Sequence, residues 1–197
     1  MKTIGILLLS FFIVPATFSQ AFEKGSNFIT LGFGLDPYEK GFKINDGSGR
    51  RNTSLGPIIL AYEHGITDLL GIGRIGVGGA VAQSFYTSKS YKDKGAYIYE
   101  YKSNTYRTSL ALRAAYHFDF GVEKMDVYAG VGGALHVYSD TQSYDDPDQF
   151  YKRKSVRVGG GPSVFGGIRY FFANGFGIYA EAGYDISALN GGFVFKF

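Results

Sequence analysis

The sequence predicts an all-β fold, an eight-stranded antiparallel up-and-down barrel, and three observations support this prediction. Apolar and polar residues alternate with a period of two in segment after segment, which is typical of strands. The 197 residues include 29 Gly, 16 Tyr and 18 Phe but no Cys and no Trp, and a chain rich in aromatic residues favours strands. The connections between the predicted strands alternate between long and short, as expected when successive strands run up and down.

The start of the chain predicts a secretory signal peptide. It reads "MKTIGILLLSFFIVPATFSQ", with the basic residue Lys2, an apolar run over residues 4–14, and small residues before Gln20. A transmembrane helix needs about 20 apolar residues, so this run is too short for one. We therefore expect a signal peptide at 1–19 and a single exported domain at 20–197, which has no disulfide bonds because the chain lacks Cys.

The clearest alternation defines four successive strands in the second half of the chain. Each has one apolar face and one face of charged and small residues. In the first of them, Leu110 and Leu112 share a face, whereas Arg107 and Arg113 lie on the other. The predicted strands are 106–118, 127–138, 156–171 and 176–186. In 156–171, Phe165 is a misfit among the small and charged residues of the polar face.

Four further segments complete the predicted set of eight. They are 28–35, 58–64, 72–85 and 189–197. The connections 36–54, 87–104 and 139–154 are long and polar, whereas 65–70, 119–125 and 172–175 are short, and 187–188 is a tight turn. An even number of strands returns both chain ends to the same side of a barrel.

The apolar face of the strands is predicted to point outward. Glycine and alanine accompany the charges on the other face, which suits the narrow interior of an eight-stranded barrel. Large aromatic residues near the strand ends are typical of girdles at the two membrane interfaces. We therefore interpret the chain as a transmembrane β-barrel with three long extracellular loops and short periplasmic turns; the alternative is a soluble exported sandwich or lipocalin-like barrel.

With these features, residues 22–197 resemble the small OmpA/OmpX-type barrels of Gram-negative outer membranes. The resemblance implies an outer-membrane protein with both termini periplasmic, surrounded by lipid and lipopolysaccharide, and most simply a monomer. It also implies that the terminal aromatic residues Phe193, Phe195 and Phe197 act as the signal for the outer-membrane insertion machinery. The fold hosts structural, adhesive and enzymatic members, so it does not fix a function. The charge of the mature chain is close to balanced, and no nucleic-acid footprint is visible.

Nine charged or titratable residues are predicted to form a network in the lumen. They are Glu63, Arg74, Arg107, Arg113, His117, Arg157, Arg169, Glu181 and Asp185. Charges in a narrow lumen are costly unless paired, so Glu63 and Glu181 are expected to bridge the surrounding arginines. Five arginines face three carboxylates in this set, and the surplus leaves open a narrow small-solute pore with a slight anion preference.

A lipid A modifying enzyme is the alternative from another class. Such an enzyme needs a nucleophile with a base in reach, and the histidines are His64, His117 and His136. His136 with Ser139 is the candidate near the outer surface, but this spacing on a strand places the two side chains on opposite faces. We expect no catalytic site, metal or cofactor.

Tyrosines also extend beyond the predicted membrane segment. In "AYIYEYKSNTY" the residues Tyr97, Tyr99 and Tyr101 continue the alternation, followed by Tyr106 in a shifted phase, which predicts that the two neighbouring strands protrude from the bilayer. Exposed strands rich in tyrosine can pair with or stack on a partner. A girdle with a solvated hairpin explains them equally well. We expect a mainly structural or surface-interaction role for the protein, with an unidentified extracellular ligand.

Overall fold

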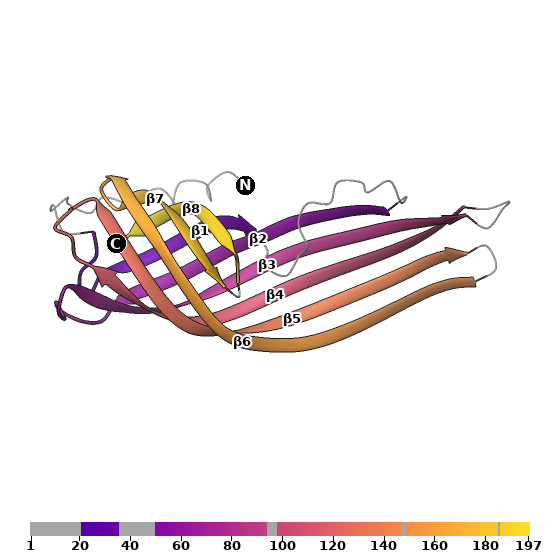
Figure 1. The fold of residues 1–197 in the computed structure, drawn as a ribbon, viewed down its shortest axis with the longest axis horizontal. Helices are drawn as coiled ribbons and strands as arrows, with labels where there is room; N and C mark the ends of the chain where they lie inside the picture. Colours follow the sequence, from indigo (N-terminus) through magenta and orange to yellow (C-terminus); the bar gives the residue numbers. More distant parts are fainter. Residues whose placement is uncertain (1–20, 36–49, 94–97, 147–148, 185) are drawn as a thin grey trace, which may run out of the picture.

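Eight antiparallel strands form one closed ring in the computed structural model of the chain (Figure 1). The structure describes residues 21–35, 50–93, 98–146, 149–184 and 186–197, so the predicted signal peptide lies outside the described residues. The strands are β1 (Asn27–Leu35), β2 (Arg50–Gly65), β3 (Gly73–Asp93), β4 (Ile98–Phe118), β5 (Met125–Asp146), β6 (Gln149–Ala173), β7 (Phe176–Tyr184) and β8 (Leu189–Lys196).

The ring closes where the first strand meets the last. β1 pairs with β8 in antiparallel register, with Ile29 opposite Phe195. Below this ladder, the backbones of Asn27 and Phe197 exchange two hydrogen bonds of 3.0 Å. The predicted up-and-down barrel is therefore confirmed. No helix in the described part of the chain is long and apolar enough to cross a bilayer.

The apolar face of each strand points outward, as the sequence predicted. In β1, buried and exposed residues alternate from Phe28 to Leu35. In β4, Leu112 is 78% exposed, whereas the neighbouring Ala111 is buried. Small residues fill the interior at the centre of the barrel, where Ala80, Ala111 and Ala134 pack together. Water-facing barrels show the opposite polarity, so this arrangement suits a hydrocarbon surrounding.

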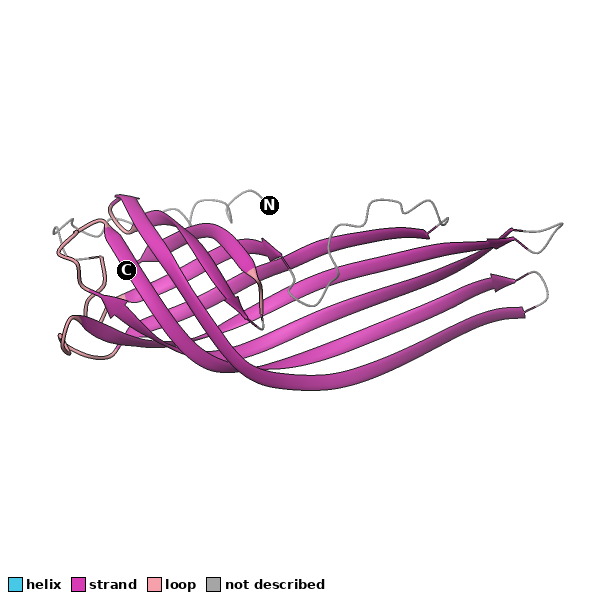
Figure 2. Ribbon diagram, viewed as in Figure 1, coloured by secondary structure: helices cyan, strands magenta, loops and turns pink. Residues whose placement is uncertain are grey.

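Five strands continue far beyond the closed ring. β1, β7 and β8 contain eight or nine residues, whereas β2 to β6 contain between 16 and 25. Figures 1 and 2 show β2 to β6 leaving the ring as one curved sheet, which we call the protruding sheet. Much of the sequence assigned to long loops is therefore strand. Its polar stretches still alternate and are rich in Tyr and Thr, which favour strands without a buried apolar face.

The short connections lie together at the other end of the barrel. They join β2 to β3, β4 to β5 and β6 to β7, at the end that also holds the C-terminus (Figure 1). Gly71, Gly121 and Gly175 adopt positive φ angles in these three turns, a conformation that costs little without a Cβ. The predicted pattern of short turns at one end is present.

Closure of the ring depends on glycine at position 192, which gives a first prediction. A Cβ there would lie 2.1 Å from the backbone oxygen of Leu31 on the neighbouring strand. We expect Gly192→Val to prevent β1 from pairing with β8, so that the heat-dependent shift of a closed barrel on an SDS gel disappears. Gly161→Val is the matched control, because nothing lies within 4 Å of its Cβ position. A normal shift for Gly192→Val would contradict the closure seen here.

Candidate functional site: the lumen and the protruding sheet

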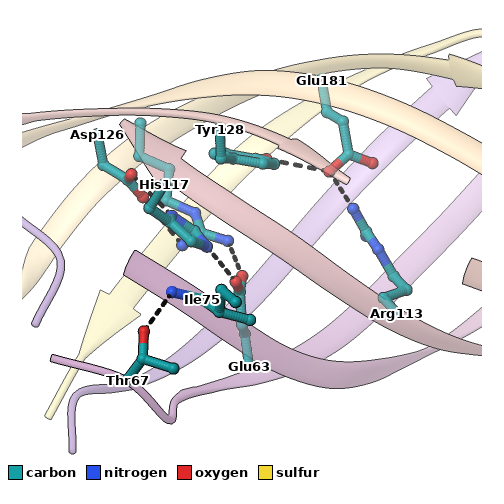
Figure 3. A network of polar contacts seen from close by, with 9 residues as sticks. Glu63, Thr67, Ile75, Arg113, His117, Asp126, Tyr128 and Glu181 are labelled. Atoms are coloured by element: carbon teal, nitrogen blue, oxygen red, sulfur yellow. Dashed lines mark hydrogen bonds and ion pairs between the residues drawn. The ribbon is translucent and has the colours of Figure 1, made fainter. Parts of the chain in front are cut away.

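A buried ionic cluster fills the lumen near the end with the short turns. Arg169 of β6 donates to Glu63 of β2 and, at 3.1 Å, to Asp126 of β5. The ring of His117 lies between the same two carboxylates, with Nδ1 2.8 Å from Asp126 and Nε2 2.5 Å from Glu63. Figure 3 shows His117 between Asp126 and Glu63. The cluster thus ties four strands together across the lumen.

A second cluster surrounds Glu181 of β7. Arg113 of β4 forms an ion pair with its carboxylate, and the Tyr128 hydroxyl donates to the same oxygen at 3.0 Å (Figure 3). The guanidinium of Arg113 also stacks over the ring of Phe165, 3.6 Å from its centre. Phe165, the large residue that broke the alternation, therefore serves as a platform for a buried cation. Gly130 makes room for it, because a Cβ there would lie 2.3 Å from the Phe165 ring.

The residues before β1 close the barrel at the same end. Phe22 is 5% exposed and stacks on the His117 ring, with ring centres 3.5 Å apart. It also stacks on Phe28 at 5.2 Å. Gly25 and Ser26 bond to the backbone of Gly65 at 2.8 and 2.9 Å, which fixes the segment in place. We call Ala21–Ser26 the N-terminal plug.

Other predicted lumen residues lie outside these two clusters. Arg74 pairs with Asp119 in the β4–β5 turn at 2.8 Å, and Arg107 is buried and donates to the Ile186 carbonyl at 2.9 Å. Arg157 differs from the prediction: its side chain is 67% exposed and pairs with Asp140. It stands on the protruding sheet, where β7 no longer encloses it. Asp185 lies outside the described residues.

The space left inside the barrel is small. A cavity of about 20 Å³ lies between the two clusters and is lined by Thr30, Tyr179 and Asn190 as well as by members of both. Such a volume holds about one water molecule. Asp119, Asp126 and Asp140 supply carboxylates that the sequence count of the lumen did not include. With Glu63 and Glu181 they give five described carboxylates for the five arginines, so the surplus of positive charge in that count disappears.

His136 lies inside the barrel wall, and His64 lies at the barrel end. His136 is buried, and its Nδ1 lies 2.8 Å from the Ser109 hydroxyl. Ser139 is exposed on the opposite face of β5, as the sequence indicated. His64 lies 2.9 Å from the Asn27 side chain at the barrel end. Among the described residues, no group of three or more acidic or histidine side chains is arranged to hold a metal ion.

The protruding sheet carries Tyr101 and Tyr106 of the predicted surface tyrosines and has two open edges among the described residues. Tyr106 is 45% exposed and packs edge-on against Phe85. Tyr101 lies on the same strand, opposite Ser90 and Tyr144, whereas Tyr97 and the Tyr99 side chain are not described. Within the described residues, β6 pairs with β5 alone over 149–163, and β2 pairs with β3 alone over 50–55.

Sequence reasoning missed two central members of the lumen. Asp126 precedes the predicted strand at 127–138 by one residue, and extending the alternation by that residue would have placed it inward. Phe22 lies in no strand, so no periodic signal marks it. Its apolar character beside Ala21, directly after the predicted cleavage site, was the available hint.

Of the comparisons with known proteins, the one with solved structures found similar chains. No protein-family model matches the chain, and no curated protein sequence matches it. Two similar solved structures are of Ail, the attachment invasion locus protein of Yersinia pestis. One, in complex with the heparin analogue sucrose octasulfate, has a TM-score of 0.49 and 14% identity, covering 88% of this chain and 99% of that one. The other has a TM-score of 0.45 and 13% identity with the same coverage.

The ring of eight antiparallel strands decides the architecture. This closed ring has the architecture of the small OmpA/OmpX-type barrels.

Removing one member of the ionic cluster tests whether the lumen is dry. We expect Glu63→Ala to lower the free energy of unfolding by about 3–5 kcal/mol, because it leaves the buried Arg169 without one of its carboxylates. Urea unfolding in lipid vesicles, followed by circular dichroism, measures this. Lys24→Ala removes the exposed ion pair with Asp68 and should change nothing measurable. A loss below about 1 kcal/mol for Glu63→Ala would mean that water solvates the lumen charges.

Proposed function

We propose that this protein is an integral outer-membrane barrel of a Gram-negative bacterium with a structural and surface-interaction role. The ring anchors the chain in the membrane, and the protruding sheet presents a binding surface outside the cell. The observation that carries this proposal is the continuation of five strands beyond a ring whose outer wall is apolar. A barrel with only an anchoring task needs no strands longer than the membrane requires, about 9–11 residues.

The orientation follows from the two ends of the barrel. Outer-membrane barrels have short turns on the periplasmic side and long connections outside. Here the short turns, the N-terminal plug and the C-terminus share one end, and the protruding sheet leaves the other. Both termini are therefore periplasmic in the proposal. An exported chain with its signal peptide removed at 1–19 fits this placement.

The open edges of the protruding sheet suit recognition of an extended partner. The unpaired side of β6 over 149–163 presents a row of backbone donors and acceptors. An extended peptide can add to such an edge as a further strand. Tyrosines on the sheet add contact surface at low entropic cost. The extracellular ligand in the proposal is thus a polypeptide segment rather than a small solute.

The C-terminal strand is proposed to serve assembly. Phe193 and Phe195 are 51% and 42% exposed on the outer wall, and Phe197 is 55% exposed just beyond β8. All three rings are accessible in the closed barrel. We assign them to recognition by the outer-membrane insertion machinery, with lipid and lipopolysaccharide as their later surroundings.

The two other functions considered from the sequence lack a supporting observation. For a pore, the described lumen offers a cavity of about 20 Å³. For a lipid A modifying enzyme, Ser139 and His136 lie on opposite faces of β5, and the serine that contacts His136 is itself buried. We propose a charge-filled lumen without catalytic residues.

Trimming the protruding sheet separates anchoring from binding. Replacing 88–103 and 141–154 by Asn-Gly turns leaves Thr87 opposite Asn104 and Asp140 opposite Ser155 as the closing pairs. We expect the trimmed protein to keep its heat-dependent gel shift, because the ring is intact. Cells displaying it should lose adhesion to protein-coated and cell-coated surfaces relative to cells displaying the full chain.

Trypsin on intact cells provides the control for location. The full chain offers Lys152, Arg153 and Lys154 on an exposed strand and should be cut there, whereas the trimmed protein lacks these residues and should not give the corresponding fragments. Equal adhesion of the two proteins would contradict the surface role. Cleavage that appears only after the outer membrane is opened would contradict the orientation.

Recordings across a planar bilayer test the state of the lumen. Because the ionic clusters and the N-terminal plug fill it, the refolded full chain is expected to show no stepwise conductance. The size of the folded fraction, taken from the gel shift, serves as the control for insertion. Reproducible anion-selective steps would instead support the narrow pore.

A further inference from the structure

The free edge of β6 carries a concentration of positive charge. Over 149–163 the strand pairs with β5 alone among the described residues, and Figure 1 shows it as the last strand on that side of the protruding sheet. This stretch contains no carboxylate and four cations, which are Lys152, Arg153, Lys154 and Arg157. Backbone pairing at a strand edge does not require charge, so the concentration calls for a separate explanation.

The protein itself neutralises little of this charge. The residues of β5 that lie opposite 152–154 are all neutral: Thr141, Gln142 and Ser143. Within the described part of the chain, the three cations at 152–154 form no ion pair. Arg157 pairs with Asp140, but its side chain remains 67% exposed. The charge at 152–154 is therefore left for water or for a partner.

Both faces of this edge strand are accessible. Every residue from 151 to 160 is exposed, whereas residues 101–105 of β4, in the middle of the same sheet, are half-buried. Strand alternation places the two lysines on the outward face with Val158, and the two arginines on the opposite face. Cations therefore lie on both faces of the edge, where the side chains of an added strand would also lie.

Glycines and then a proline follow the charged part of the edge. At position 159 the nearest atom to a Cβ belongs to the Tyr138 ring at 3.8 Å, and at position 161 nothing lies within 4 Å, so packing requires neither glycine. Glycine in a strand often marks a place where another backbone approaches closely. Pro162 has no backbone N–H to donate, and proline in a sheet is confined to edges. The edge that can pair therefore ends at Pro162, just before β7 begins to pair at Val164.

A second copy of the chain is a poor partner for this edge. The other free edge of the sheet, β2 over 50–55, begins with Arg50 and Arg51 and contains no carboxylate. Two copies would bring basic edges together, and like charges directly opposite each other in a sheet are destabilising. Lysines on edge strands protect proteins from such pairing. The same charges favour a strand of opposite sign, because cross-strand pairs of opposite charge stabilise a sheet.

We propose that the free edge of β6 binds an extended acidic polypeptide segment, which adds to the protruding sheet as a strand. The carboxylates of the segment lie beside the lysines on one face of β6 and beside the arginines on the other. Its larger side chains lie over Gly159 and Gly161. A sulfated polysaccharide matches the charges but not the row of backbone donors and acceptors, so a polypeptide fits more of the observations. The inference rests on the proposed surface-interaction function and names the chemistry of the partner.

Two labelled peptides test the preference for an acidic segment. Both consist of valine and threonine around the same charged positions, which are glutamate in one peptide and lysine in the other. Fluorescence anisotropy measures their binding to the full chain folded in detergent micelles. We expect the association constant of the glutamate peptide to be higher by about tenfold, because its charges lie opposite cations. Equal association constants would overturn the proposal.

Reversal of charge at the edge should reverse this preference. Lys152→Glu combined with Lys154→Glu should lower the association constant of the glutamate peptide by about tenfold and raise that of the lysine peptide. The matched control makes the same change in net charge away from the edge. It combines Lys102→Glu, on β4, which is paired on both sides, with Lys124→Glu in the β4–β5 turn. The control should bind as the unchanged chain does; an equal loss in both variants would mean that binding follows total charge, which contradicts the proposal.

A third peptide tests whether backbone pairing is needed. It has the glutamate sequence with a methyl group on every backbone nitrogen, which keeps the charges and removes the N–H donors. We expect it not to bind the full chain measurably. Binding as tight as that of the unmethylated peptide would show an anion patch that a sulfated polysaccharide serves equally well, and strand addition would be wrong.

The trimmed protein separates failure of this inference from failure of the proposed function. It lacks 141–154, and with that segment three of the four cations, so it should lose the preference for the glutamate peptide. If the full chain binds both peptides equally and the trimmed protein binds neither, edge recognition stands and only the acidic partner is wrong. If the full chain and the trimmed protein bind the glutamate peptide alike, the protruding sheet is not the binding surface, and the proposed function fails as well.

Discussion

Closure of the ring between β1 and β8 is the constraint on which the rest of the structure depends. A strand edge in hydrocarbon would leave backbone groups unpaired at a cost of several kcal/mol each, so a membrane barrel must close. Eight strands close around a lumen only wide enough for side chains. Inward charges in that lumen cannot be hydrated, so Arg169, Arg113 and their carboxylates must satisfy one another. The ionic clusters are thus a consequence of strand number.

The same constraint ends where the protein leaves the membrane. Beyond the ends of β1, β7 and β8 the sheet has free edges, which water can satisfy. Arg157 and Asp140 lie in this open part of the sheet. They form an ion pair, yet the arginine side chain is largely exposed to water. Outside the ring, charged residues are hydrated and need no compensating partner, so they can contact a binding partner instead. Short strands on one side of the barrel and long strands on the other therefore divide one sheet into an anchor and a surface.

The strands of the ring could be predicted from the sequence because the alternation of apolar and polar residues is a local pattern. Alternation along a strand depends on neighbours two residues apart, and the glycine-rich charged face identified the inside. The sequence predicted the lumen contacts less well, because partners such as Glu63 and Arg169 are 106 residues apart and meet only through the register of four intervening strand pairings. Asp126 was missed for a different reason, because the predicted strand 127–138 began one residue after it whereas β5 begins at Met125. The lengths of β3 to β6 were underestimated. Their outer parts are polar and resemble loops in the sequence, because what makes them strands is pairing with a neighbouring strand.

Phe22 shows that a residue outside the strands also fills part of the lumen. Its ring covers one face of His117 and Tyr128 lies toward the other, with ring centres 3.5 and 5.3 Å from the imidazole. The contacts of His117 with Glu63 and Asp126 are therefore shielded from water only when the N-terminal plug is seated. The plug in turn needs the backbone of Gly65, which is in place once β1 and β2 have paired. Pairing of β1 with β2 therefore also holds the plug over His117, and the segment that follows the predicted cleavage site completes the burial of the charges.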